Sequence, residues 1–99
     1  MEVYYFHFTR RCLICRTIEK ITREVASELR DERVHFEALN IEKKEGREIA
    51  GKLGVNGQSL LIVSGDMSVG LTRKGFLYAL TDQERLKSII LEKIQSFLL

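Results

Sequence analysis

The chain lacks the features that mark several classes of protein. It has no proline, no tryptophan and only two cysteines in 99 residues, whereas a secreted domain held by disulfides carries more cysteines, spread far apart. Its formal net charge is only +2, and no run of basic residues is longer than two. Because nucleic-acid-binding surfaces concentrate positive charge, we expect no nucleic-acid partner. No apolar run approaches the roughly 20 residues that a transmembrane helix needs, so we expect no membrane partner either.

The composition that is present predicts one folded domain. Hydrophobic residues make up 44% of the chain and charged residues 30%, which argues against disorder. A length of 99 residues suffices for one core, so we expect a single domain over residues 1–99, as a monomer rather than a dimer. The N-terminal basic residues follow the apolar run instead of preceding it, unlike a signal peptide, and we therefore expect a cytoplasmic protein.

The hydrophobic pattern of the first two thirds of the chain predicts an α/β fold. Apolar and β-branched residues run through 2–8 and 59–64, which predicts buried strands, and residues 33–41 alternate as a third strand does. Apolar residues recur every three or four positions over 14–29. This spacing predicts an amphipathic helix with its N-terminus near Cys12.

The remaining segments complete the predicted order. Residues 43–54 favour a short helix that stops at Gly54, a suitable C-cap. A tight turn at positions 65 and 66 would join the preceding strand to a second strand within 67–75 as a hairpin. The residues TDQE at 81–84 predict a capping box, with Thr81 as the N-cap of a C-terminal helix. The order β-α-β-α-β-β-α implies a central mixed four-stranded sheet with helices on both faces.

The two cysteines lie where the first strand gives way to the first helix. A helix N-terminus offers unpaired amides and partial positive charge, and Arg10 and Arg11 add full charges, so a thiolate is favoured at Cys12. Cys15 lies one turn later on the same side and is more sheltered. We therefore predict Cys12 as a nucleophile and Cys15 as the resolving cysteine, supported by Thr9 and by the charge of Arg11.

With its C-x-x-C after the first strand, its element order and its terminal hairpin and helix, the chain resembles the thioredoxin and glutaredoxin superfamily over nearly its whole length. The segment VYYFHFTRRCLICRTIEKIT is more narrowly similar to small thioredoxin-like proteins catalogued as accessory subunits of nitrophenyl-compound nitroreductases. The resemblance implies a thioredoxin-like fold. It also implies an enzyme that needs no cofactor and exchanges electrons with a protein disulfide or dithiol partner through Cys12 and Cys15.

Two departures from the superfamily pattern concern the docking of the substrate and the step in which the resolving cysteine reacts. Members generally have a cis-proline facing the C-x-x-C, but here Gln58 and Ser59 occupy the matching place, which we expect to be the substrate-docking loop. A cis bond without proline costs about 3 kcal/mol, so we expect a trans peptide there. Typical thioredoxins also bury a carboxylate on the first strand behind the resolving cysteine, where residues 6–8 contain no acid.

Three other interpretations of the cysteine pair stay open. The cysteines can be two packed small hydrophobes, or they can bind a soft metal ion or metalloid. A structural zinc site needs four ligands, and only His7 and His35 could supplement the pair. The chain can also be a redox-inactive thioredoxin-like binding module. We interpret His7 as a strand residue with a satisfied ring rather than as a proton shuttle.

Overall fold

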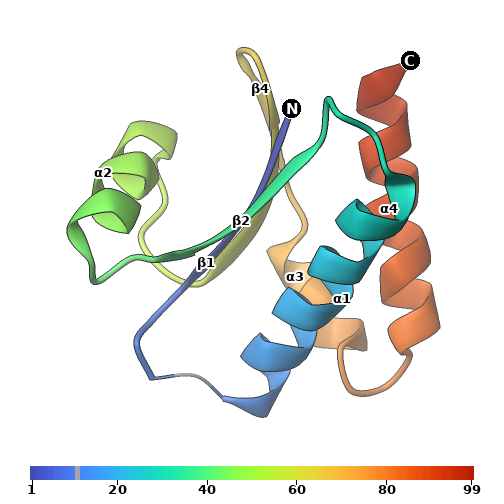
Figure 1. Cartoon of the computed structure of the whole chain (residues 1–99). Coiled ribbons are helices and arrows are strands. Elements are labelled where there is room, and N and C mark those ends of the chain that lie inside the picture. The colour runs from blue at the N-terminus through green and yellow to red at the C-terminus, as the bar shows by residue number, and fades with distance from the viewer. Residues whose placement is uncertain (11) are drawn as a thin grey trace.

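A computed structural model of the chain describes residues 1–10 and 12–99 and places helices on both faces of a mixed sheet (Figure 1). The described residues form four strands and four helices, in the order β1 (Glu2–His7), α1 (Leu13–Leu29), β2 (His35–Asn40), α2 (Lys44–Leu53), β3 (Ser59–Ser64), β4 (Met67–Gly70), α3 (Thr72–Tyr78) and α4 (Gln83–Leu98). The predicted α/β architecture with a mixed four-stranded sheet is thus confirmed. None of the helices in the described ranges is long and apolar enough to cross a bilayer.

The sheet has the strand order β2-β1-β3-β4, with β1 at its centre beside β3. Strand β1 runs parallel to β2, with Tyr5 opposite Ala38, and antiparallel to β3, with Phe6 opposite Ser59. Strands β3 and β4 form the predicted hairpin, whose turn contains Gly65 at a φ of 59°. The end of β1, the end of β2 and the start of β3 consequently share one edge of the sheet.

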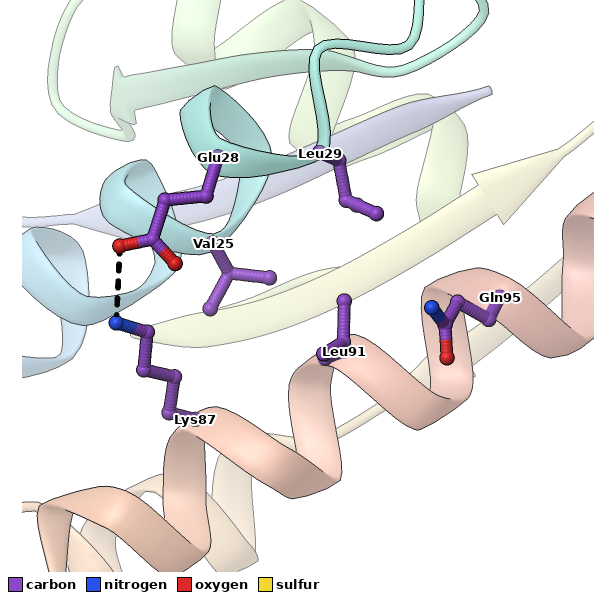
Figure 2. A pocket seen from close by; sticks show the side chains of 6 residues that line it. All are labelled: Val25, Glu28, Leu29, Lys87, Leu91 and Gln95. Carbon is purple, nitrogen blue, oxygen red and sulfur yellow. Dashed lines mark hydrogen bonds and ion pairs between the residues drawn. The ribbon is translucent and has the colours of Figure 1, made fainter.

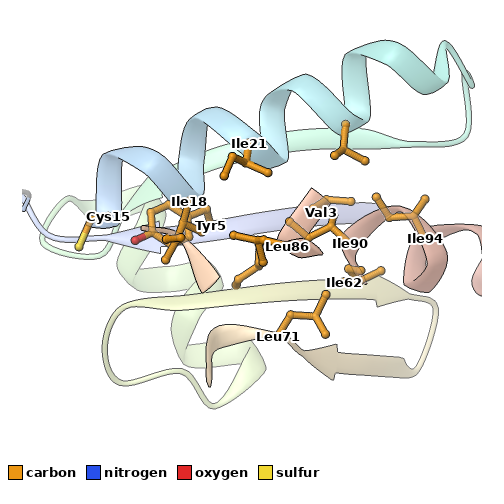
Figure 3. Packing of buried hydrophobic residues seen from close by; sticks show 13 residues of the cluster. Val3, Tyr5, Cys15, Ile18, Ile21, Ile62, Leu71, Leu86, Ile90 and Ile94 are labelled. Carbon is orange, nitrogen blue, oxygen red and sulfur yellow. The ribbon is translucent and has the colours of Figure 1, made fainter. Parts of the chain in front are cut away.

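The two faces of β1 contribute to two separate apolar clusters. Val3 and Tyr5 belong to the larger cluster, beneath α1, α3 and α4 (Figure 3). Its other buried members are Cys15, Ile18, Ile21, Val25, Leu60, Ile62, Leu71, Ala79, Leu86, Ile90 and Ile94. Phe6 points the other way and packs with residues of β2 and α2. This two-sided burial explains why a strand with few polar residues occupies the middle of the sheet.

Helix α2 approaches the end of β2 closely at Gly46. A Cβ atom added to Gly46 would lie 2.1 Å from the backbone oxygen of Asn40, so only glycine fits there. The helix ends as predicted at Gly54, which adopts a φ of 71° and donates its N–H to the carbonyls of Ala50 and Gly51. A glycine at this left-handed position carries no Cβ penalty.

Residues 67–75 differ from the prediction, because the strand stops at Gly70 and α3 begins at Thr72. The Leu71 N–H still donates to the Leu60 carbonyl at 2.8 Å, but the Leu60 N–H donates to the Thr72 hydroxyl at 3.0 Å. The Thr72 hydroxyl therefore takes the place that a backbone carbonyl of a longer strand would have. The chain then turns away from the sheet into α3, a helix that was not predicted.

The predicted N-cap of the C-terminal helix is wrong by one residue. Asp82 is the N-cap of α4, and its carboxylate accepts a hydrogen bond from the Arg85 N–H at 3.1 Å. The hydroxyl of Thr81 donates instead to the Leu77 carbonyl at 2.8 Å. Thr81 therefore serves the end of α3, the helix whose presence the sequence pattern did not indicate.

We expect Gly46→Ala to lower the free energy of unfolding by about 1–3 kcal/mol, the usual cost of overpacking, because its Cβ would overlap the Asn40 carbonyl. Gly51→Ala in the same helix is the matched control. Its Cβ has nothing within 4 Å, so it should stabilise the chain by roughly 0.5–1 kcal/mol. Urea denaturation of the two variants measures both effects. Equal stability would contradict the close approach of α2 to β2.

Candidate functional site

The two cysteines lie at the start of α1, on the sheet edge where β1 ends. Cys12 is the N-cap residue of α1, with extended backbone angles, and its side chain is exposed. Cys15, in the first turn, has 0% of its surface exposed. Both are free thiols, and their sulfur atoms are 2.8 Å apart. The predicted placement of an exposed Cys12 beside a sheltered Cys15 is therefore confirmed.

The surroundings of Cys12 favour its thiolate. The pKa of Cys12 is lowered, chiefly by a hydrogen bond from the Cys15 thiol and next by the Cys15 backbone N–H, which lies 3.3 Å from the Cys12 sulfur. The Ile14 amide adds a smaller effect, while partial desolvation opposes it. The first turn of α1 contains no acidic side chain that would repel the negative charge. A lowered thiol pKa at a helix N-terminus is a feature that reactive cysteines share.

The loop that leads from β1 to Cys12 is connected to the loop that follows β2. The Thr9 N–H donates to the Glu42 carboxylate at 2.7 Å, and the Asn40 side-chain amide donates to the Thr9 hydroxyl at 3.0 Å. The pKa of Glu42 is lowered, chiefly by the Thr9 N–H and next by the Thr9 hydroxyl. Asn40 closes the connection by accepting the Glu42 N–H at 2.9 Å. Through these hydrogen bonds, Thr9 holds the loop before Cys12 against the loop that follows β2.

Tyr5 lies on the same face of β1 as the cluster that contains Cys15 (Figure 3). Its ring is completely buried, and burial, followed by the neighbouring Cys15 thiol, raises the pKa of Tyr5 well above its usual value. Tyr5 is not among the residues predicted for the site. The period of two in a strand could have pointed to it, because this period puts Val3, Tyr5 and His7 on one face, toward the helix whose N-cap is Cys12.

The predicted docking residues Gln58 and Ser59 lie at the sheet edge of the cysteines. Ser59 begins β3 opposite Phe6, and its hydroxyl donates to the Gly57 carbonyl at 3.0 Å. No peptide bond in the described parts of the chain is cis, as expected for a segment without proline. None of the hydrogen bonds described for these two residues reaches either cysteine, and their role in docking stays a prediction.

The other predicted residues contribute less to the site. Arg11 lies outside the described residues, so its electrostatic role stays a prediction. His7 is buried, and its Nδ1 lies 2.9 Å from the Phe8 carbonyl oxygen, consistent with a satisfied ring. His35 begins β2, at the opposite edge of the sheet from the end of β1. In the described ranges, no three His, Cys, Asp or Glu side chains gather as metal ligands would.

A hollow of about 220 Å³ between α1 and α4 is separate from the cysteines (Figure 2). It is lined by Val25, Glu28, Leu29, Lys87, Leu91 and Gln95. Lys87 and Glu28 form an ion pair of 3.0 Å at its margin. Val25 follows Cys15 by ten residues of α1, or about 15 Å along the helix axis, so the hollow is not part of the site.

Comparisons of the chain with models of protein families, with curated proteins and with solved structures find no match. The chemistry of the site is therefore inferred from its own geometry. An exposed thiol of lowered pKa can form a mixed disulfide with an external sulfur. The neighbouring buried thiol can then displace that sulfur and form a disulfide with the exposed cysteine.

We expect Cys15→Ala to raise the pKa of Cys12, because it removes the thiol hydrogen bond that lowers this pKa most. Cys15→Ser is the matched variant, since its hydroxyl still offers a donor, and its Cys12 should titrate at lower pH than in Cys15→Ala. The pH dependence of the alkylation rate measures both values, as one thiol remains in each variant. Identical titrations would show that the neighbouring side chain does not stabilise the Cys12 thiolate.

Proposed function

We propose that this chain is a dithiol–disulfide oxidoreductase of the thioredoxin-like type that exchanges electrons with a protein partner. The main observation in support is the exposed Cys12 thiol of lowered pKa, whose sulfur lies 2.8 Å from that of the buried Cys15. In this proposal Cys12 is the nucleophile and Cys15 is the resolving cysteine. We also propose that the protein acts in the cytoplasm, where thiols are kept reduced.

The reaction proceeds in two exchange steps. The Cys12 thiolate attacks one sulfur of a partner disulfide, so a Cys12–partner bond forms, the partner's own bond breaks, and the released thiolate takes up a proton. Cys15 then loses its proton and attacks the Cys12 sulfur, which forms the Cys12–Cys15 disulfide and releases the second partner thiolate. The chain is oxidised by two electrons, and the partner is reduced by two. The reverse sequence oxidises a partner dithiol.

The different exposure of the two thiols supports this division of roles. Cys12 can be approached by a large molecule, whereas Cys15 is accessible chiefly to Cys12. A disulfide requires a sulfur separation of about 2.05 Å, so closing the pair from 2.8 Å needs only a small displacement. A mixed disulfide on Cys12 is therefore next to the thiol that resolves it.

Exposed apolar side chains near Cys12 favour a protein as the partner. Leu13 follows the nucleophile directly and is 68% exposed. The connection between α3 and α4 lies at the same end of the molecule as the start of α1 (Figure 1), and its Leu80 is exposed, as is Leu77 near the end of α3. Apolar groups in these positions gain contact area when another protein covers them.

The sheet topology also supports the thioredoxin-like assignment. Only β1 and β2 are parallel, β3 and β4 form a hairpin on the other side of β1, and the cysteines begin the helix that follows β1. The trans peptides before β3 and the absence of an acid at residues 6–8 distinguish this chain from typical members. We therefore assign the exchange chemistry to the two thiols, without naming a particular reductase as their electron donor.

A redox titration with glutathione tests the proposed function. We expect a reversible two-electron transition within the range of cellular poise, about −320 to −180 mV, when the pair is read by alkylation and mass. Cys12→Ser should abolish it. A pair that stays reduced across this range would overturn the proposal, and a pair that reacts only after metal is removed would favour soft-metal binding instead.

Trapping tests the assignment of the two roles. Cys15→Ser should accumulate mixed disulfides between Cys12 and a model disulfide protein, because the resolving thiol is missing. Cys12→Ser is the matched control, since its remaining thiol is buried and should form no adduct. Gel mobility without and with reductant measures the adducts. Adducts in the control and none in Cys15→Ser would reverse the assignment.

A further inference from the structure

The hydroxyl of Tyr5 is a buried polar group with no hydrogen-bond partner of good geometry among the described residues. Among the described residues it is the single buried side-chain oxygen or nitrogen without a hydrogen bond, and Tyr5 itself is 0% exposed. Burying a hydroxyl without a hydrogen bond lowers the stability of the fold, and such groups in native proteins call for an explanation. The apolar face of β1 would be equally well filled by phenylalanine, which has no such cost.

The hydroxyl is directed toward the end of the cluster where Cys15 lies (Figure 3). The described ionisable groups around it are few. Cys15, Cys12 and Glu19 of α1 all act to raise the pKa of Tyr5, after the larger effect of burial, and the His7 ring is stacked beside it at 6.3 Å between centroids. Tyr5 is therefore a neutral phenol at physiological pH, and its O–H remains available as a donor.

Cys15 needs such a donor at one stage of the proposed reaction. In the free dithiol its sulfur shares a hydrogen bond with Cys12 at 2.8 Å. Once Cys12 is bonded to a partner sulfur, it has no proton to share, and Cys15 must ionise while completely buried. Burial disfavours a thiolate, whereas a hydrogen bond donated to the thiolate lowers the thiol pKa.

We propose that Tyr5 is a positioning residue for the resolving step, whose hydroxyl donates a hydrogen bond to the Cys15 thiolate while Cys12 carries the partner. This inference rests on the proposed function. Cys15 releases its proton to solvent, and its thiolate attacks Cys12. The Cys12–partner bond breaks as the Cys12–Cys15 bond forms, and the partner leaves as a thiolate. Tyr5 keeps its own proton throughout.

The direct test measures the pKa of Cys15 in a Cys12→Ala background, which removes the other donor. Tyr5→Phe should raise this pKa by about one unit, because the variant loses a hydrogen bond that favours the charged form of Cys15. Tyr4→Phe is the matched control, as Tyr4 packs against the cluster on the opposite face of β1. The chemical shift of the Cys15 β-carbon in labelled protein reports the titration.

A second measurement follows the resolving step itself. Cys12 is loaded as a mixed disulfide with 5-thio-2-nitrobenzoate, and the release of that thiolate is timed. With Tyr5→Phe, release should be roughly tenfold slower at neutral pH, and the difference should vanish above the Cys15 pKa. Tyr4→Phe should behave as the wild-type chain does.

The outcomes separate the inference from the proposed function. If the wild-type chain never releases the thiolate, the exchange function fails, while the β-carbon titration still tests Tyr5. If the wild-type chain releases it and Tyr5→Phe changes neither the rate nor the Cys15 pKa, the role of Tyr5 is overturned. A Tyr5→Phe variant that is more stable but has an unchanged Cys15 pKa would likewise show that the hydroxyl is only an unsatisfied polar group.

Discussion

Strand β1 is buried on both of its faces, and this constraint places the groups of the candidate site. Val3 and Tyr5 fill the cluster below α1, while Phe6 fills the one below α2. A strand with this pattern is most stable at the centre of a sheet, where both faces are covered. Because β1 is central and parallel to β2, the helix that follows it must cross one face of the sheet. The start of that helix, with Cys12 as its N-cap, therefore lies above the strand end that contains Tyr5.

The same arrangement gives the two cysteine side chains different exposure and different hydrogen bonds. Cys12 and Cys15 are separated by one helical turn, yet the first lies outside the helix at its N-cap and the second points into the larger cluster. The N-cap position exposes Cys12 and supplies it with the Cys15 amide, whereas the inner position removes Cys15 from water. The loop before Cys12 is held by Thr9 and Glu42, so this geometry does not depend on the cysteines alone.

Much of the fold could be predicted because the relevant forces act locally or repeat with a clear period. The buried strands, the amphipathic α1 and the glycine end of α2 were recognised in this way, as was the position of Cys12. Helix α3 was missed because its first turn is determined by a long-range contact, in which Thr72 accepts the Leu60 N–H. The error at Thr81 followed from that omission, since its hydroxyl serves the end of α3. Tyr5 was missed because the apolar run over 2–8 indicates a buried strand but does not reveal what a buried hydroxyl in it contacts.

A phenol and a carboxylate would act differently on a buried thiol. A carboxylate can accept the thiol proton, but its own negative charge then opposes the thiolate. A tyrosine of raised pKa stays a neutral phenol that does not take up that proton, and a hydrogen bond that it donates to the sulfur becomes stronger once the proton has left. Residues 6–8 contain no acid, so in the proposed reaction we expect the proton of Cys15 to pass to solvent and not to a carboxylate of this segment. In this proposal, the bond between Cys12 and its partner makes the ionisation of Cys15 necessary, and a hydrogen bond from the Tyr5 hydroxyl lowers its free-energy cost.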